Sequence, residues 1–352
     1  MLFDLPDHNT LYLALLSRDE RYDGRVYVCV SSTGVFCRLT CPARKPNPEN
    51  CLFYSTISEC IEAGFRACKR CHPLQAAASA DPTITALLAA LAERSGIRWS
   101  ERHIEELGFD LSTVRRSFKR HFGTTFLRMA RQTQLRRGFE VLSRGGRVIT
   151  AQHEASFDSP SAFRVAFARL LGCTPASLSK KGGVLADWIA TPLGDMIAVS
   201  SPTHLHLLEF TDRRALRTEL KNLQARTKGG MGIGRLGPTE QAEEELIAFF
   251  AGRKACFETP LALQGSVFNR QVWEELRRIP VGETRSYSDI ARRIGKPSAA
   301  RAVARANGAN QIALMVPCHR VIAADGALTG YGGGLWRKQR LIEIERQFVL
   351  LK

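Results

Sequence analysis

The pattern of apolar and polar positions divides the chain into a helical middle part and a mixed C-terminal part. Apolar residues recur at helical spacing through 84–91, 114–126 and 163–171, which predicts amphipathic helices. From 188 to 210, apolar and polar residues alternate between Pro-Leu-Gly and Ser-Pro turns, so we expect a small sheet there. The helical patterns that follow this sheet run over 240–251, 268–278, 287–294 and 335–348.

Two short segments of small and polar residues separate these parts. The segment HPLQAAASADP (72–82) has the alanine and proline content of a linker, and SKKGG (179–183) is a second joint. We therefore expect three domains. They are 1–74, 82–180 and 186–352, the last with a sheet subdomain at about 188–262 and a helical subdomain at about 263–348.

Length, composition and charge indicate a multidomain globular protein with an anionic partner. Of 352 residues, 44% are hydrophobic and 24% are charged, which excludes disordered and fibrous classes. Fifty Lys and Arg residues against 34 Asp and Glu residues give a net charge of +16, which favours nucleic acid. No apolar run approaches the roughly 18 residues of a membrane-spanning helix. We expect a cytoplasmic protein without a membrane partner, and a monomer, because the sequence shows no dimerisation seam.

Four cysteines in the first domain have the spacing of a zinc site. Three residues separate Cys37 from Cys41, and two separate Cys68 from Cys71. Tetrahedral Zn²⁺ takes two ligands from each such pair, so we expect one zinc ion; spacing alone also allows a purely structural role. The other cysteines of this domain are expected to be small buried hydrophobic residues, and they are Cys29, Cys51 and Cys60.

The residues around these cysteines resemble the N-terminal domain of the Ada family of DNA methyltransferases and transcription regulators. The matching segments are STGVFCRLTC (32–41) and FRACKRC (65–71). The resemblance implies that Cys37 accepts a methyl group from a DNA methylphosphotriester. Zinc keeps a thiolate deprotonated and nucleophilic, and methylation would make the site less negative and raise its affinity for DNA. The basic residues expected near DNA are Arg38, Arg44, Arg66, Lys69 and Arg70.

An internal repeat in the middle domain predicts paired helix-turn-helix motifs. The pattern Phe-x-Arg-x-x-Gly-x-Thr occurs at 118–125 and again at 167–174. Periodicity alone equally allows a generic helical bundle. The repeat and the segment FDSPSAFR (157–164) resemble the AraC-type DNA-binding domain, which implies recognition helices near 110–121 and 159–170. The residues expected to face DNA are Ser112, Thr113, Arg115, Arg116, Lys119, Ser161 and Arg164.

The second motif departs from the AraC-type pattern. Ser156 stands where glycine is usual, and Gln152 and His153 occupy positions of apolar core residues. We expect binding to double-stranded DNA, including promoter DNA. Activation of transcription, with RNA polymerase as a further partner, rests on the family resemblance.

The segment VPCHRVI (316–322) carries the second candidate nucleophile. A histidine next to Cys318 can take the thiol proton directly or through one water, although a Cys-His pair alone is weak evidence. The segment resembles the active site of O6-alkylguanine-DNA alkyltransferases, and the likeness extends over about 188–348. It implies a structural role for Asn310 and makes Glu345 the carboxylate that orients His319.

The same resemblance implies how the damaged base is reached. A target atom inside a duplex requires the nucleotide to be turned out. Arg301 would fill the vacated stack, and Tyr287 would donate a proton toward the guanine. The base pocket would be formed by the backbone carbonyls of Cys318 and Val321 and by the loop that begins with Tyr331 and Gly332.

These resemblances imply a multidomain α+β protein. Its parts are a small four-cysteine zinc domain, an all-α double helix-turn-helix domain, and an alkyltransferase with a ribonuclease-H-like sheet subdomain and a helical active-site subdomain. The implied activity is that of a suicide DNA repair enzyme, a methylated-DNA–[protein]-cysteine S-methyltransferase. It takes methyl groups from phosphotriesters onto Cys37 and from O6-methylguanine and O4-methylthymine onto Cys318.

The regulatory part of the prediction has two competitors. In the favoured interpretation, the protein methylated on Cys37 binds promoters and activates the alkylation response. One alternative is a repair protein with no regulatory role. The other is a zinc-containing transcription factor whose C-terminal domain is inert.

Overall fold

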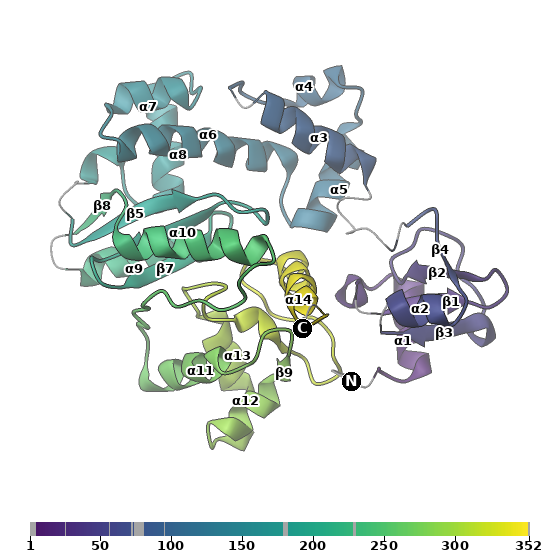
Figure 1. Ribbon diagram of the computed structural model, residues 1–352. Coiled ribbons are helices and arrows are strands. Elements are labelled where there is room, and N and C mark those ends of the chain that lie inside the picture. Colours follow the sequence, from purple (N-terminus) through teal and green to yellow (C-terminus); the bar gives the residue numbers. More distant parts are fainter. Residues whose placement is uncertain are drawn as a thin grey trace.

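The computed structural model describes residues 5–24, 26–55, 57–71, 73, 81–94, 96–178, 182–227 and 230–350. Most of the predicted linker at 72–82 and the SKK part of the predicted joint at 179–183 lie outside the described residues. Among the described helices, none has the length and apolar character needed to span a membrane. Figure 1 shows an N-terminal lobe, a helical lobe and a helix-covered sheet around the C-terminal helix.

The N-terminal lobe is built on a four-stranded sheet in the order β3-β1-β2-β4. β1 pairs antiparallel with β2 and β3, whereas β2 pairs parallel with β4. The parallel pairing brings Cys37 of β2 close to Cys68, which directly follows β4. The elements are α1 (His8–Ser17), β1 (Tyr27–Val30), β2 (Val35–Arg38), β3 (Cys51–Tyr54), α2 (Ile57–Glu62) and β4 (Arg66–Ala67).

The helical lobe contains two helices that match the predicted recognition helices. They are α5 (Leu111–Phe122) and α8 (Pro160–Leu171). Asp110 and Ser159 cap their N-termini by accepting hydrogen bonds from backbone N–H groups, and both helices end at a glycine with positive φ. The repeat in the sequence therefore encodes two equivalent helix ends. The other helices are α3 (Pro82–Glu93), α4 (Glu101–Glu106), α6 (Phe126–Ser143) and α7 (Val148–Glu154).

The C-terminal part begins with a sheet in the order β7-β6-β5-β8 that is buried on both faces. In β6, Met196 and Ala198 share a core with α10, whereas Ile197 and Val199 share another with α6 and α8. Apolar residues therefore occupy both faces of this strand instead of alternating with polar ones. The elements are β5 (Val184–Ile189), β6 (Met196–Ser200), β7 (Leu205–Phe210), α9 (Leu216–Arg226), β8 (Met231–Ile233) and α10 (Gly237–Phe250).

The core behind this sheet continues into the helical lobe. Phe139 of α6 and Phe167 of α8 lie in one apolar cluster with Trp188 of β5. The ring centroids of Phe139 and Trp188 are 5.7 Å apart. The domain limits near 180 and 186 stay a prediction, but the apolar packing runs across them.

The remaining elements form the helical subdomain that holds the Pro-Cys-His-Arg segment. Cys318 lies in a short 3₁₀ turn, η5 (Cys318–Arg320), directly before β10 (Val321–Ile322). β10 pairs parallel with β9 (Arg285–Ser286). The helices are α11 (Val267–Arg277), α12 (Tyr287–Arg293), α13 (Ala300–Gly308) and α14 (Leu335–Leu350).

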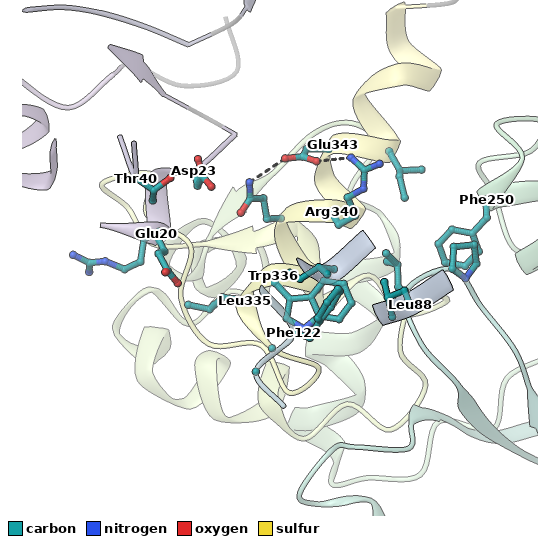
Figure 2. A pocket seen from close by; sticks show the side chains of 18 of the residues that line it. Glu20, Asp23, Thr40, Leu88, Phe122, Phe250, Leu335, Trp336, Arg340 and Glu343 are labelled. Atoms are coloured by element: carbon teal, nitrogen blue, oxygen red, sulfur yellow. Dashed lines mark hydrogen bonds and ion pairs between the residues drawn. The ribbon is translucent and has the colours of Figure 1, made fainter. Parts of the chain in front are cut away.

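Helix α14 is the element at which the three parts of the chain meet (Figure 2). Trp336 packs edge-to-face against Phe122 of α5, with ring centroids 5.0 Å apart. A cavity of about 800 Å³ beside this contact is lined by residues from all three parts. Glu343 accepts hydrogen bonds from Gln339 and Arg340 at its edge.

Candidate metal centre and buried cysteine site

The four predicted cysteine ligands converge in the N-terminal lobe. Their Sγ atoms all lie within 4.8 Å of one another, and those of Cys41 and Cys68 are 4.0 Å apart. Tetrahedral zinc with Zn–S bonds of about 2.3 Å requires sulfur separations of about 3.8 Å, so the four thiols fit one zinc ion. No second group of three or more Cys, His, Asp or Glu side chains with this geometry occurs in the part of the chain that the structure describes.

Backbone and lysine groups hold the two ligand loops in place. The Arg70 N–H donates to Cys68 Sγ at 3.4 Å. Lys45 Nζ donates to the carbonyls of Leu39 and Cys41 at 3.1 and 3.4 Å. The first contact lies within the loop after β4, and the Lys45 contacts hold the loop after β2. Three further cysteines are buried as predicted, namely Cys29, Cys51 and Cys60.

Arg38 differs from the expectation of a DNA contact at the surface. The side chain is buried, its Nε donates to the Cys71 carbonyl at 3.3 Å, and its guanidinium lies 3.5 Å from the Asp23 carboxylate. Arg38 therefore braces the ligand loop. The other four basic residues expected near DNA are exposed, and they are Arg44, Arg66, Lys69 and Arg70.

The two predicted recognition helices present their polar candidates to solvent. In α5, Val114 and Phe118 are buried, whereas the opposite face is exposed. The exposed residues on this face are Ser112, Thr113, Arg115, Arg116 and Lys119, and those on α8 are Ser161 and Arg164. Both helices are thus arranged for contact with a partner outside the lobe.

The three departures from the AraC-type pattern are accommodated locally. Ser156 adopts the left-handed conformation with φ of 53°, and its Oγ donates to the Gly96 carbonyl at 2.6 Å. Gln152 is buried, and its Nε2 donates to the Phe157 carbonyl at 2.8 Å. His153 lies on the surface. The second motif therefore keeps its turn without the usual glycine.

Cys318 is buried next to an amide. Asn310 Nδ2 donates to Cys318 Sγ at 3.2 Å and to the Val316 carbonyl at 2.9 Å, and Asn310 Oδ1 accepts from the Ile312 N–H at 3.0 Å. Burial raises the pKa of Cys318, and the hydrogen bond from Asn310 partly opposes this shift. The thiol is therefore protonated at neutral pH and requires a base to become a nucleophile.

His319 and Glu345 form a buried pair behind the cysteine. His319 Nε2 lies 2.8 Å from Glu345 Oε1, and Arg320 donates to both Glu345 oxygens at 2.8 Å. Burial alone would raise the pKa of Glu345, but attraction to His319 and the hydrogen bonds from His319 and Arg320 lower it to about 2. Burial lowers the pKa of His319, and this outweighs the attraction of Glu345, which raises it.

These shifts define the proton positions at neutral pH. An ionised Glu345 only accepts hydrogen bonds, so His319 Nε2 must carry the proton that it donates. The lone pair of the neutral imidazole is then on Nδ1, which is buried and has no hydrogen-bond partner among the described residues. The free Nδ1 of His319 can therefore accept a proton.

The pocket beside Cys318 is bounded by α13 and the glycine loop. Asn307, Gly308, Tyr331 and the glycines 330 and 332–333 line it. Tyr287 OH donates to the Thr329 carbonyl at 3.3 Å, and burial raises its pKa. The Tyr331 ring meets the His319 ring edge-on at 6.5 Å. Arg301 is exposed in the first turn of α13.

The two carbonyls expected to read the base already accept intramolecular hydrogen bonds. Asn307 Nδ2 donates to the Cys318 carbonyl at 3.3 Å, and Lys338 Nζ donates to the Val321 carbonyl. A carbonyl oxygen has two lone pairs, so each retains capacity for one further donor.

Sequence reasoning missed four residues around this site. Arg320 lies inside the recognised motif, and Lys338 lies two helical turns before Glu345 on α14. The sequence positions of both residues could therefore have identified them as neighbours of the site. Arg213 donates to the carbonyls of Gly308 and Asn310 at 2.9 and 2.8 Å, and no sequence pattern pointed to this residue. The fourth residue is Asn307.

Comparison with known proteins matches all three parts of the chain. The metal binding domain of Ada matches residues 10–73, a helix-turn-helix domain matches 104–181, and the DNA binding domain of 6-O-methylguanine DNA methyltransferase matches 267–347. These matches and the four-cysteine geometry confirm the predicted fold class and the single zinc ion.

Individual relatives extend over nearly the whole chain. The regulatory protein ada of Salmonella typhimurium is 33% identical over 358 residues, covering 96% of each chain. The bifunctional transcriptional activator/DNA repair enzyme Ada of Escherichia coli is 34% identical over 339 residues, covering 95% of each. A methylated-DNA–protein-cysteine methyltransferase of Salmonella typhimurium is 39% identical over 169 residues, which are 47% of this chain and 98% of that protein.

Proposed function

The chain belongs to the Ada family of regulatory DNA repair proteins, and from that premise we propose that it moves methyl groups from DNA onto Cys318 and Cys37. It is a bifunctional DNA repair methyltransferase and transcriptional activator of the Ada type, and its partner is DNA. The observation that carries the proposal for Cys318 is the buried Asn310–Cys318 contact beside the His319–Glu345 pair, and the convergence of four cysteines supports Cys37. This arrangement supplies a nucleophile, a base and a carboxylate that fixes the base.

At Cys318 the reaction is a direct displacement at carbon. His319 Nδ1 takes the thiol proton, directly or through one water, while Glu345 stabilises the imidazolium. The sulfur lone pair forms the S–C bond to the methyl of O6-methylguanine. The C–O bond breaks, and its electron pair stays on the guanine. Tyr287 OH donates a proton to the departing guanine, and the phenolate regains one from solvent while His319 releases one.

Access to the methyl group requires the nucleotide to leave the helix. Arg301 is exposed in the first turn of α13 and would enter the stack in its place. The base would then lie between Tyr331, Gly332 and the carbonyls of Cys318 and Val321. O4-methylthymine presents the same methyl ether chemistry to the pocket.

At Cys37 the acceptor is one of four thiolates that would hold zinc together with Cys41, Cys68 and Cys71. Bound zinc keeps these thiols deprotonated at neutral pH. The Cys37 sulfur attacks the methyl carbon of an uncharged phosphotriester, the C–O bond breaks, and a phosphodiester anion leaves. The exposed residues Arg44 and Arg66 supply positive charge beside the strand.

Both reactions end in a thioether, which is a poor leaving group, so each site acts once. Methylation of Cys37 removes one negative charge from the thiolate cluster and thereby favours DNA, which supports promoter binding by the methylated protein. The candidate DNA contacts are Arg115, Arg116, Lys119 and Arg164 together with Lys69 and Arg70. We propose a monomer that acts in the cytoplasm and contacts RNA polymerase at the promoters it activates.

Peptide mass mapping tests both acceptors in one experiment. The full zinc-loaded chain is incubated with DNA carrying methylphosphotriesters and O6-methylguanine, in parallel with the variants Cys37→Ser and Cys318→Ser. We expect one methyl group on each cysteine, saturating stoichiometrically, and each variant should lose only its own site. Labelling of neither cysteine in the wild type would overturn the proposal.

A further inference from the structure

A groove of about 730 Å³ separates the second helix-turn-helix from the alkyltransferase part. One wall is formed by α6 and α8. The other is formed by the segment that links β7 to α9 and by the first turn of α9. The two walls therefore come from parts of the chain that carry different activities. Packing of α8 against α9 below the groove fixes their spacing.

Five exposed arginines line this groove. They are Arg128 and Arg131 of α6, Arg169 of α8, and Arg214 and Arg217 on the opposite wall. Among the described residues, none of these five forms an ion pair with a carboxylate. Burial and the like charges of Arg98 and Arg169 lower the pKa of Arg131, whose guanidinium group lies over the Phe157 ring, 4.8 Å from its centroid.

Three neighbouring arginines outside this set of five form ion pairs with carboxylates. Arg136 pairs with Asp195 at 3.2 Å, Arg137 pairs with Glu154 at 3.5 Å, and Arg213 pairs with Glu219 at 3.0 Å. Each of these three arginines therefore has a carboxylate partner. Five guanidinium groups without a carboxylate partner around one groove raise the free energy of the folded protein through repulsion, and an anionic ligand would lower that cost.

The shape and composition of the groove favour the phosphodiester backbone. Guanidinium groups bind phosphate through paired hydrogen bonds, and arginines on two facing walls match a polymer better than a small anion. The wall from α8 also exposes Val165, whose side chain is 67% accessible and which follows Arg164. An apolar side chain on an exposed helix among arginines is suited to the floor of a DNA groove, where thymine offers a methyl group.

We propose that this groove binds the backbone of duplex DNA held by α8, with Arg214 and Arg217 of the alkyltransferase part contacting its phosphates. The inference rests on the proposed DNA binding of the second helix-turn-helix and deepens it. The alkyltransferase part would then strengthen DNA binding by the second helix-turn-helix. Removal of that part would weaken DNA binding even though both helix-turn-helix motifs remain.

The test compares two double variants of the full zinc-loaded chain with equal loss of charge. Arg214→Ala/Arg217→Ala changes the groove, whereas Arg226→Ala/Arg253→Ala changes two exposed arginines outside it. The probe is a fluorescent duplex of about 30 base pairs, roughly three helical turns, titrated by anisotropy at several salt concentrations. Thermal unfolding verifies that the variants fold.

We expect the groove variant to bind at least fivefold more weakly and its salt slope to fall by about 1.8, because each phosphate contact contributes about 0.9. The DNA affinity of the control variant should change by less than twofold. Equal losses in both variants, or none in either, would overturn the inference while leaving wild-type DNA binding intact. Failure of the wild type to bind would instead overturn the proposed function. Loss of poly-glutamate binding in the groove variant, with DNA binding unchanged, would assign the groove to an acidic protein segment and also overturn the inference.

Discussion

Asn310 Nδ2 lies 3.2 Å from Cys318 Sγ and 2.9 Å from the Val316 carbonyl oxygen, so one amide contacts both the thiol and the backbone before it. We expect Asn310→Ala to slow methyl transfer to Cys318 by about ten- to a hundredfold. A hydrogen bond to a charged group contributes about 1.5–3 kcal/mol, and the thiolate loses this donor. Single-turnover transfer from O6-methylguanine duplex measures the rate. The control is Gln311→Ala, which removes the side-chain amide of the next residue. An unchanged rate in Asn310→Ala would refute a role of Asn310 in methyl transfer.

Glu345 is the buried partner of both His319 and Arg320. We expect Glu345→Gln to destabilise the protein by about 3–5 kcal/mol, because Arg320 is left buried without a counterion. Transfer to Cys318 should fall as well, since an amide no longer fixes the proton on Nε2. The matched control is Glu343→Gln on the same helix, whose partly exposed pair with Arg340 contributes about 1 kcal/mol or less. Thermal unfolding distinguishes the two variants, and equal decreases in their melting temperatures would contradict the prediction.

The pH dependence of transfer reports the state of His319. Its ordinary pKa is 6.5, and burial lowers it. The imidazole therefore stays unprotonated as the pH falls through 6.5, so the Cys318 transfer rate should hold from neutral pH down to this value and decline only below it. Removal of the Glu345 charge takes away the attraction that raises the His319 pKa. Glu345→Gln should therefore move the decline to lower pH. A wild-type rate that halves at or above pH 6.5 would exclude a lowered pKa.

The candidate site residues were largely identifiable from sequence because they lie in short segments. Cys37 and Cys41 lie on one chain reversal, and Cys318 and His319 are adjacent, so spacing alone brings their side chains together. Helix limits also followed from local signals, since Asp110 and Ser159 are capping residues. Such features depend on neighbours within a few residues.

Features that depend on packing between distant segments were not predictable. Periodicity identifies the buried face of α8 but not the element that covers it. The packing of α8 against α9 across the joint could therefore not be predicted from the sequence. Arg38 was expected to contact DNA because it is a basic residue next to Cys37 in the sequence. Its burial follows from Asp23, which is brought beside it by folding of the N-terminal lobe.

The four-cysteine cluster predicts that zinc binding depends on each of its thiols. Cys41→Ser should abolish stoichiometric zinc binding and methyl uptake at Cys37, because three thiols no longer complete a tetrahedral site. Uptake at Cys318 should persist. Cys60→Ser changes a buried cysteine outside the cluster and should retain zinc. Elemental analysis gives the zinc content and mass mapping gives the methyl acceptors. Zinc retained at one equivalent in Cys41→Ser would show that this thiol is not a ligand.

Ser156 shows how the second helix-turn-helix tolerates a missing glycine. Its φ of 53° is a left-handed conformation that costs a residue with a Cβ about 1–2 kcal/mol, while its hydrogen bond to the Gly96 carbonyl returns about 1 kcal/mol. Ser156→Gly loses the bond but relieves the strain, so its stability should lie within about 1 kcal/mol of the wild type. Ser156→Ala loses the bond and keeps the strain, so it should be less stable than Ser156→Gly by about 1 kcal/mol. Urea unfolding orders the three proteins. An alanine variant as stable as the glycine variant would mean that the turn relaxes out of the left-handed region.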